Sequence, residues 1–121
     1  FPIDNRAAVA AMLSRCAGPE KTAAVTAKLF ATQEDWAFVQ GAGAVPALFK
    51  QAEASGFTKE TFDKCLADDK LLDNIARERE RAATKFGVRS TPSFFINGKR
   101  FEGDNTKVEA FDAVIEPLLK S

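Results

Sequence analysis

The chain has no histidine, no tyrosine and only two cysteines among its 121 residues. The absence of histidine excludes His general bases, Ser-His-Asp triads and zinc sites that use His ligands. The cysteines, Cys16 and Cys65, lie far apart in the sequence and form no CxxC pair. Two isolated thiols are a poor ligand set for zinc, so we expect no metal site.

The sequence also lacks an excess of charge of either sign. Lys plus Arg and Asp plus Glu each number 17, which gives a formal net charge of zero and no electrostatic sign of nucleic-acid binding. No apolar run approaches the roughly 18 residues that a transmembrane helix needs. The chain begins with Phe1 and shows no signal-peptide pattern, so we expect that an upstream segment has been removed, which could be a signal, a tag or part of the domain.

Most of the sequence is predicted to be helical. Asp4 or Asn5 can cap a first helix, and later helices are expected after Pro19, near Pro46 and after the N-cap Thr58. A long charged helix is expected from about residue 68 to 86. Its alternating charges at residues 77–81, RERER, indicate a solvated face, and the following Gly87 favours a left-handed C-cap.

The periodicity changes only near the C-terminus. Residues 93–97, SFFIN, predict a strand, Asn97-Gly98 predicts a type I′ turn, and residues 99–102 predict the return strand. Asp104 or Thr106 can cap a last amphipathic helix. The consecutive apolar residues 94–96 are typical of a strand buried on both faces, so we expect neighbouring strands outside this sequence.

Thr91-Pro92 stands at the entrance to this strand, where the missing N–H of proline is tolerated. Only about 5–6% of X-Pro bonds in folded proteins are cis. The dipeptide alone therefore predicts a trans turn proline.

The C-terminal segment as a whole resembles the DsbA-like thiol:disulfide oxidoreductases, a thioredoxin-fold group with the pattern Gly-Val-x-x-Thr-Pro-x-Phe-x-x-Asn-Gly. The stretches AAMLSRCAG, QEDW and FDKCL resemble the helical insertion of that group, and FPID resembles the segment after its second core strand. The resemblance covers nearly all of the chain. The residues that match the C-terminal pattern are Gly87, Val88, Thr91, Pro92, Phe94, Asn97 and Gly98.

This resemblance implies an α/β fold. The truncated segment seen in this sequence would be α+β, and it would form part of a thioredoxin fold. Residues 1–86 would be the helical insertion domain, and residues 87–121 the C-terminal ββα part with a cis-Pro hairpin. In the family the catalytic CxxC lies upstream of the segment matched here. We therefore expect a truncated or proteolysed oxidoreductase that has no catalytic residue of its own and is inactive alone.

The resemblance also implies a substrate-binding loop at Ser90, Thr91 and Pro92. The backbone of Thr91 would pair with an extended substrate chain, as in β-augmentation, and its hydroxyl could tune the family's thiolate. By the residues alone, Cys16 and Cys65 could be two buried thiols. The oxidising compartment of the family favours a structural disulfide between them.

The expected partners are extended protein thiol or disulfide substrates and a redox partner protein, with no cofactor and no nucleic acid. A bacterial, periplasmic or exported location follows from the family, and a truncated chain could also self-associate. Two alternatives stay open. One is an enzyme like glutathione transferase kappa and chromene-carboxylate isomerase, although STPS and FEGDN fit the DsbA-like group better. The other is a non-catalytic peptide-binding module.

Overall fold

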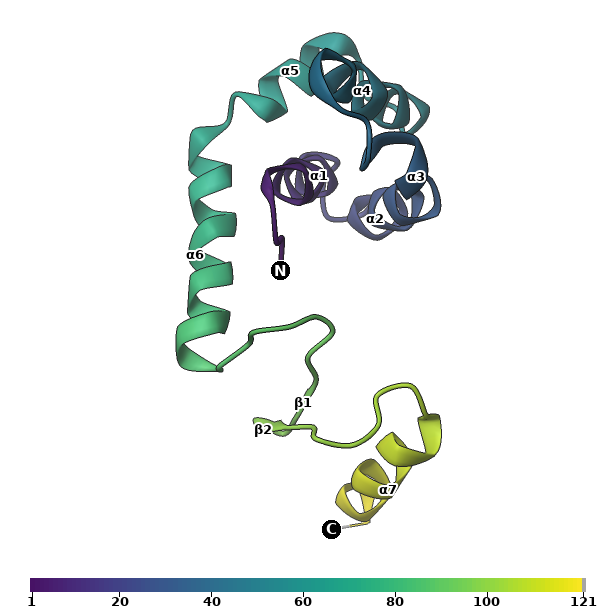
Figure 1. The fold of residues 1–121 in the computed structure, drawn as a ribbon, viewed down its shortest axis with the longest axis vertical. Helices are drawn as coiled ribbons and strands as arrows, with labels where there is room; N and C mark the ends of the chain where they lie inside the picture. Colours follow the sequence, from purple (N-terminus) through teal and green to yellow (C-terminus); the bar gives the residue numbers. More distant parts are fainter. Residues whose placement is uncertain (121) are drawn as a thin grey trace. The chain divides into compact units, whose positions relative to one another are not determined.

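A computed structural model of the chain describes residues 1–120. The chain divides into two compact units, one of residues Phe1–Phe86 and one that begins at Gly87. The first unit is helical, and the second contains a hairpin and one helix (Figure 1). Among residues 1–120, no helix is both long enough and apolar enough to cross a membrane.

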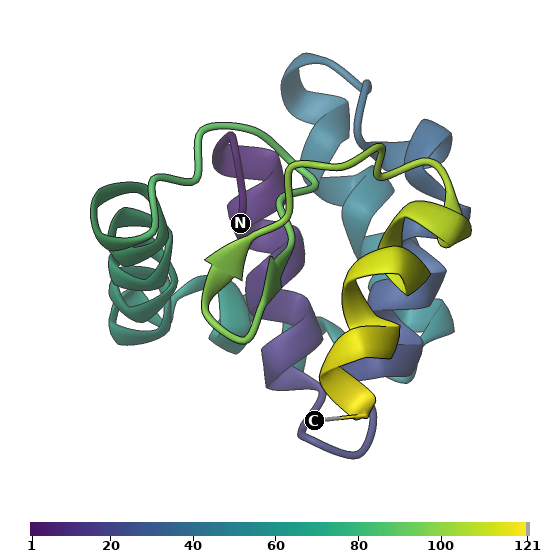
Figure 2. The same cartoon turned by 90° about the horizontal axis from the view of Figure 1, so that it is seen from below.

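Six α-helices and one 3-10 turn form the first unit. They are α1 (Asn5–Cys16), α2 (Thr22–Ala31), α3 (Gln33–Trp36), η1 (Gly41–Gly43), α4 (Ala44–Ala54), α5 (Lys59–Leu66) and α6 (Asp69–Lys85). Helix α1 lies in the middle of this unit, with α6 on one side and α2 on the other in both views (Figures 1 and 2). It also contacts α5.

Local capping sets the start of several helices. The Asp4 side chain accepts a hydrogen bond from the Ala7 N–H at 2.8 Å, and Thr58 forms a reciprocal capping box with Thr61. Both caps confirm the predicted helix starts. The second helix begins later than Pro19 predicts, because the chain first makes a turn at Gly18 (φ 87°) and α2 starts only at Thr22.

The core of the first unit is built around α1. Met12, Leu13 and Phe62 are its most completely buried side chains, and Phe62 makes an edge-on contact with Phe49 at 5.1 Å between ring centroids. Trp36 is also buried, and its Nε1 donates a hydrogen bond to the Leu29 carbonyl at 3.0 Å. The remaining core residues are Val25, Leu29, Leu48, Ala52, Phe57, Cys65 and Ile75.

The second unit contains strands β1 (Phe95–Ile96) and β2 (Lys99–Arg100) and helix α7 (Val108–Leu119). The strands are antiparallel, with Phe95 opposite Arg100 and Ile96 opposite Lys99. Asn97 (φ 49°) and Gly98 (φ 79°) both have left-handed backbones, which confirms the predicted type I′ turn.

Two details of this unit differ from the sequence predictions. The strands are shorter than residues 93–97 and 99–102, because only two residues on each side pair in a sheet that has two strands among residues 1–120. Phe94 and Phe95 are 39% and 36% exposed within this chain, and their burial by neighbouring strands outside it stays a prediction. The N-cap of α7 is Lys107, which makes no side-chain cap hydrogen bond, whereas Asp104 and Thr106 belong to the preceding turn.

Candidate functional site

The candidate site is the loop of residues 90–92, which links the end of α6 to the hairpin. Ser90, Thr91 and Pro92 are all exposed, and the Thr91–Pro92 peptide bond is cis. The Ser93 hydroxyl donates a hydrogen bond to the Ser90 carbonyl at 2.6 Å across the loop. The three residues predicted to bind substrate therefore form one continuous surface loop.

Thr91 presents backbone groups that the chain does not use. Within residues 1–120, neither its N–H nor its C=O takes part in a hydrogen bond. Exposed backbone donors and acceptors at the end of a strand can pair with another extended chain. This arrangement gives the loop a chemical capacity for binding a polypeptide through its main chain.

The loop is held on one side by a contact that the sequence did not predict. Arg100 Nη1, on β2, donates a hydrogen bond to the Gly87 carbonyl at 3.0 Å. Gly87 (φ 65°) directly follows the C-cap of α6, as the sequence predicted. The sequence feature that could have indicated this contact is the Asn97-Gly98 turn. The type of turn fixes which residues of β1 and β2 pair, and therefore where Arg100 lies along the hairpin.

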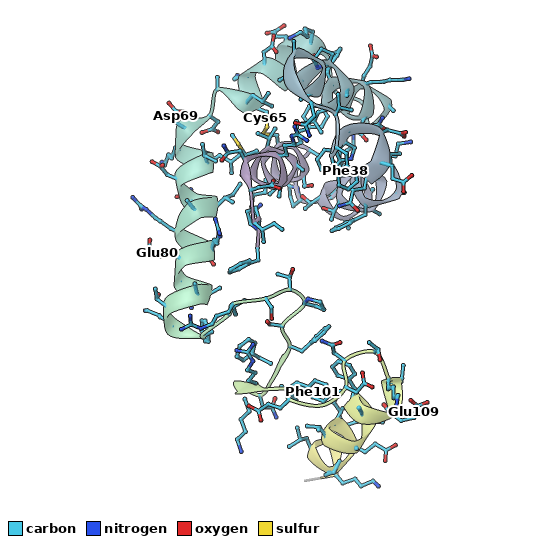
Figure 3. All side chains as sticks on the ribbon, viewed as in Figure 1. Phe38, Cys65, Asp69, Glu80, Phe101 and Glu109 are labelled. Atoms are coloured by element: carbon cyan, nitrogen blue, oxygen red, sulfur yellow. A yellow bond between two sulfur atoms is a disulfide. The ribbon has the colours of Figure 1, made fainter. Side chains whose placement is uncertain are left out.

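A small aromatic cluster holds the hairpin against α7. The Phe111 ring stacks on Phe101 with 4.2 Å between centroids and meets Phe94 edge-on at 5.0 Å. In Figure 3, Phe101 lies between the hairpin and α7. The Phe101 N–H donates to the Phe94 carbonyl at 2.8 Å, which extends the hairpin pairing one residue beyond the strands. The loop therefore leads into a hairpin that packs against α7.

The two cysteines lie in the helical unit and form a disulfide with each other. Cys16 is the last residue of α1 and Cys65 lies on α5, with 6.1 Å between their Cα atoms (Figure 3). Cys65 is buried, whereas Cys16 is exposed. The disulfide joins two helices that already pack together, and no free cysteine occurs among the described residues.

The candidate loop itself carries no titratable side chain, and the residues from 1 to 120 contain no cluster suited to a metal ion. In the second unit, Asp104 has a lowered pKa. The Thr106 hydroxyl and then the Thr106 N–H donate hydrogen bonds to its carboxylate, and they hold its pKa below the ordinary value of 3.8. The chemistry available at the loop is therefore binding rather than proton transfer.

Comparison with known proteins gives one match. A family model described as thioredoxin matches residues 1–117. No curated protein and no solved structure matches the chain.

Proposed function

The chain belongs to the thioredoxin family, and on that premise we propose that it is the substrate-contacting part of a DsbA-like protein thiol-disulfide oxidoreductase. The observation that carries this proposal is the unpaired backbone of Thr91 in an exposed loop that leads into the hairpin. An extended substrate polypeptide would pair with this backbone, so that its cysteine is presented to a dithiol pair supplied by residues outside this sequence.

The disulfide supports an exported location for this activity. Disulfides persist in oxidising compartments such as the bacterial periplasm and are rare in the cytosol. The Cys16–Cys65 bond is therefore what a protein folded in such a compartment would carry. Its partners there would be unfolded or partly folded protein substrates, together with a redox partner protein that regenerates the dithiol pair.

In the proposed reaction, the chain positions the substrate and does not exchange thiols itself. A thiolate of the external pair attacks a substrate disulfide, or a substrate thiolate attacks the external disulfide, and a mixed disulfide forms as one thiolate leaves. Both cysteines of this chain are already bonded to each other. The contribution of this chain is to hold the substrate backbone at residues 90–92.

One observation favours a second candidate, a non-catalytic peptide-binding module. Among the described residues there is no free cysteine, and neither cysteine belongs to a CxxC pair. A module of this kind would use the same loop to hold a polypeptide without any exchange step.

Peptide titration followed by NMR tests the binding surface. We expect a neutral extended peptide, with serine in place of cysteine, to shift the amide signals of residues 90–96 in the isotope-labelled chain, with Thr91 among the most affected. Shifts confined to the helical unit would contradict the proposed surface. Joining the chain to a segment that carries CxxC separates the two candidates, because only the oxidoreductase would then catalyse disulfide exchange.

A further inference from the structure

The charges of the second unit are separated between the hairpin and the terminal helix. Residues 87–103 carry Arg89, Lys99 and Arg100 against Glu102 alone, which gives a formal charge of +2. Residues 104–120 carry a formal charge of −2. The charged residues of this second segment are Asp104, Lys107, Glu109, Asp112, Glu116 and Lys120.

The cations of the hairpin are not neutralised by the chain. Arg89, Lys99 and Arg100 are exposed, and none of them forms an ion pair within residues 1–120. Arg89 and Lys99 also make no hydrogen bond there through their side chains. Lys107, the N-cap residue of α7, differs in this respect because its Nζ lies 3.6 Å from the Asp104 carboxylate.

Two of these cations, Arg89 and Arg100, lie beside the substrate loop. Arg89 is two residues before Thr91, so their Cα atoms are at most about 7.6 Å apart by chain geometry. The hydrogen bond from Arg100 to the Gly87 carbonyl brings a second guanidinium to the same segment. That hydrogen bond engages one of its N–H groups, and Arg has five in a planar fork suited to carboxylates.

We propose that the loop selects extended polypeptides that carry acidic side chains next to the bound segment. This inference rests on the proposed function, because it assigns a substrate class to the same loop. The substrate backbone pairs with Thr91, while its Asp or Glu carboxylates approach Arg89 and Arg100. The whole chain has a formal charge of zero, so such a preference has to come from the local placement of these cations.

The test compares three labelled peptides of equal length that differ only in three positions, occupied by Asp, Asn or Lys. Binding to the full chain is followed by fluorescence anisotropy at low and high salt. We expect the Asp peptide to bind about tenfold tighter than the Asn peptide at low salt, since exposed ion pairs each contribute modestly. The preference should shrink at high salt because the charges are screened, and the Lys peptide should bind weakest.

Charge-reversal variants locate the effect. Arg89→Glu changes an exposed side chain without a partner, so the fold should be kept, and circular dichroism checks this. It should remove most of the preference for the Asp peptide. The matched control is Lys120→Glu, which makes the same change of charge beyond the end of α7 and should leave the preference intact.

The outcomes separate this inference from the proposed function. If the Asn peptide binds at residues 90–96 but the Asp peptide binds no tighter, the acidic preference is wrong and the substrate loop stands. If Lys120→Glu weakens binding as much as Arg89→Glu, the effect comes from net charge and the inference is overturned. If no peptide binds, both the inference and the proposed surface are wrong.

Discussion

The Asp104 carboxylate accepts hydrogen bonds from both the hydroxyl and the N–H of Thr106, at 2.6 and 3.0 Å. These donors favour the ionised form, and the Lys107 ammonium adds to them. This small set of contacts fixes the turn before α7, where the sequence suggested a simple helix cap. Single side chains therefore decide the local path of the chain on both sides of the hairpin.

The contribution of Asp104 to the stability of this turn should be lost at low pH. Because the folded-state pKa of Asp104 is lowered, its contribution to stability is complete above the unfolded pKa of about 3.8 and is lost as the pH falls through the folded value. We expect Thr106→Val to shift the pKa of Asp104 upward in an NMR titration of the carboxyl carbon. An unchanged pKa in this variant would show that the Thr106 hydroxyl is not the cause.

Gly98 is a second residue whose backbone conformation restricts which amino acid can occupy the position. Its φ of 79° lies in the left-handed region, where a side chain with a Cβ costs about 1–2 kcal/mol. We expect Gly98→Ala to weaken the hairpin, seen as faster hydrogen exchange of the Phe101 amide, which donates to Phe94. Asn97→Gly is the matched control and should keep the turn, because glycine accepts the same backbone conformation. Equal exchange rates in both variants would contradict this account.

At the scale of elements, the disulfide connects α1 to α5 across 49 positions of sequence. A cross-link of this span restricts the unfolded chain and should stabilise the fold by about 4 kcal/mol on the loop-entropy relation. We expect the double variant Cys16→Ala, Cys65→Ala to lose stability of that order in urea denaturation. Reduction of the unmodified protein should reproduce the loss.

Alkylation checks the bond itself. The denatured, unreduced protein should leave both cysteines unlabelled, and the reduced protein should label both. Full labelling without a reductant would contradict the pairing of Cys16 with Cys65.

At the scale of the whole molecule, the chain has no free thiol among residues 1–120. We therefore expect no reduction of insulin above the background of the added reductant when this chain is assayed alone. Any measurable catalytic rate would show that the external dithiol pair of our proposal is unnecessary.

Exposed apolar side chains give a second expectation at this scale. In the second unit, large apolar groups remain exposed on α7, on β1 and just before β1. They are Phe94, Phe95, Val108, Val114, Leu118 and Leu119. Apolar surface of this kind favours association, so we expect the apparent mass in sedimentation velocity to rise with concentration. A constant monomer mass at high concentration would contradict this expectation.

The sequence by itself determined the features that depend on a few neighbouring residues. The caps at Asp4 and Thr58, the left-handed Gly87 and the Asn97-Gly98 turn were all predictable, because each follows from local backbone preferences and short hydrogen bonds. The composition also excluded histidine chemistry. The loop was predicted as a surface for polypeptides, and that assignment remains a proposal.

Only the tertiary structure decided which distant groups meet. The disulfide between Cys16 and Cys65, which the family resemblance already favoured, is confirmed only by the packing of α1 against α5, and the contact of Arg100 with Gly87 depends on the register of the hairpin. The exposure of Phe94 and Phe95 likewise depends on what lies beside β1, not on their own hydrophobicity. Local preferences act over a few residues, whereas contact and burial are set by segments far apart in the sequence.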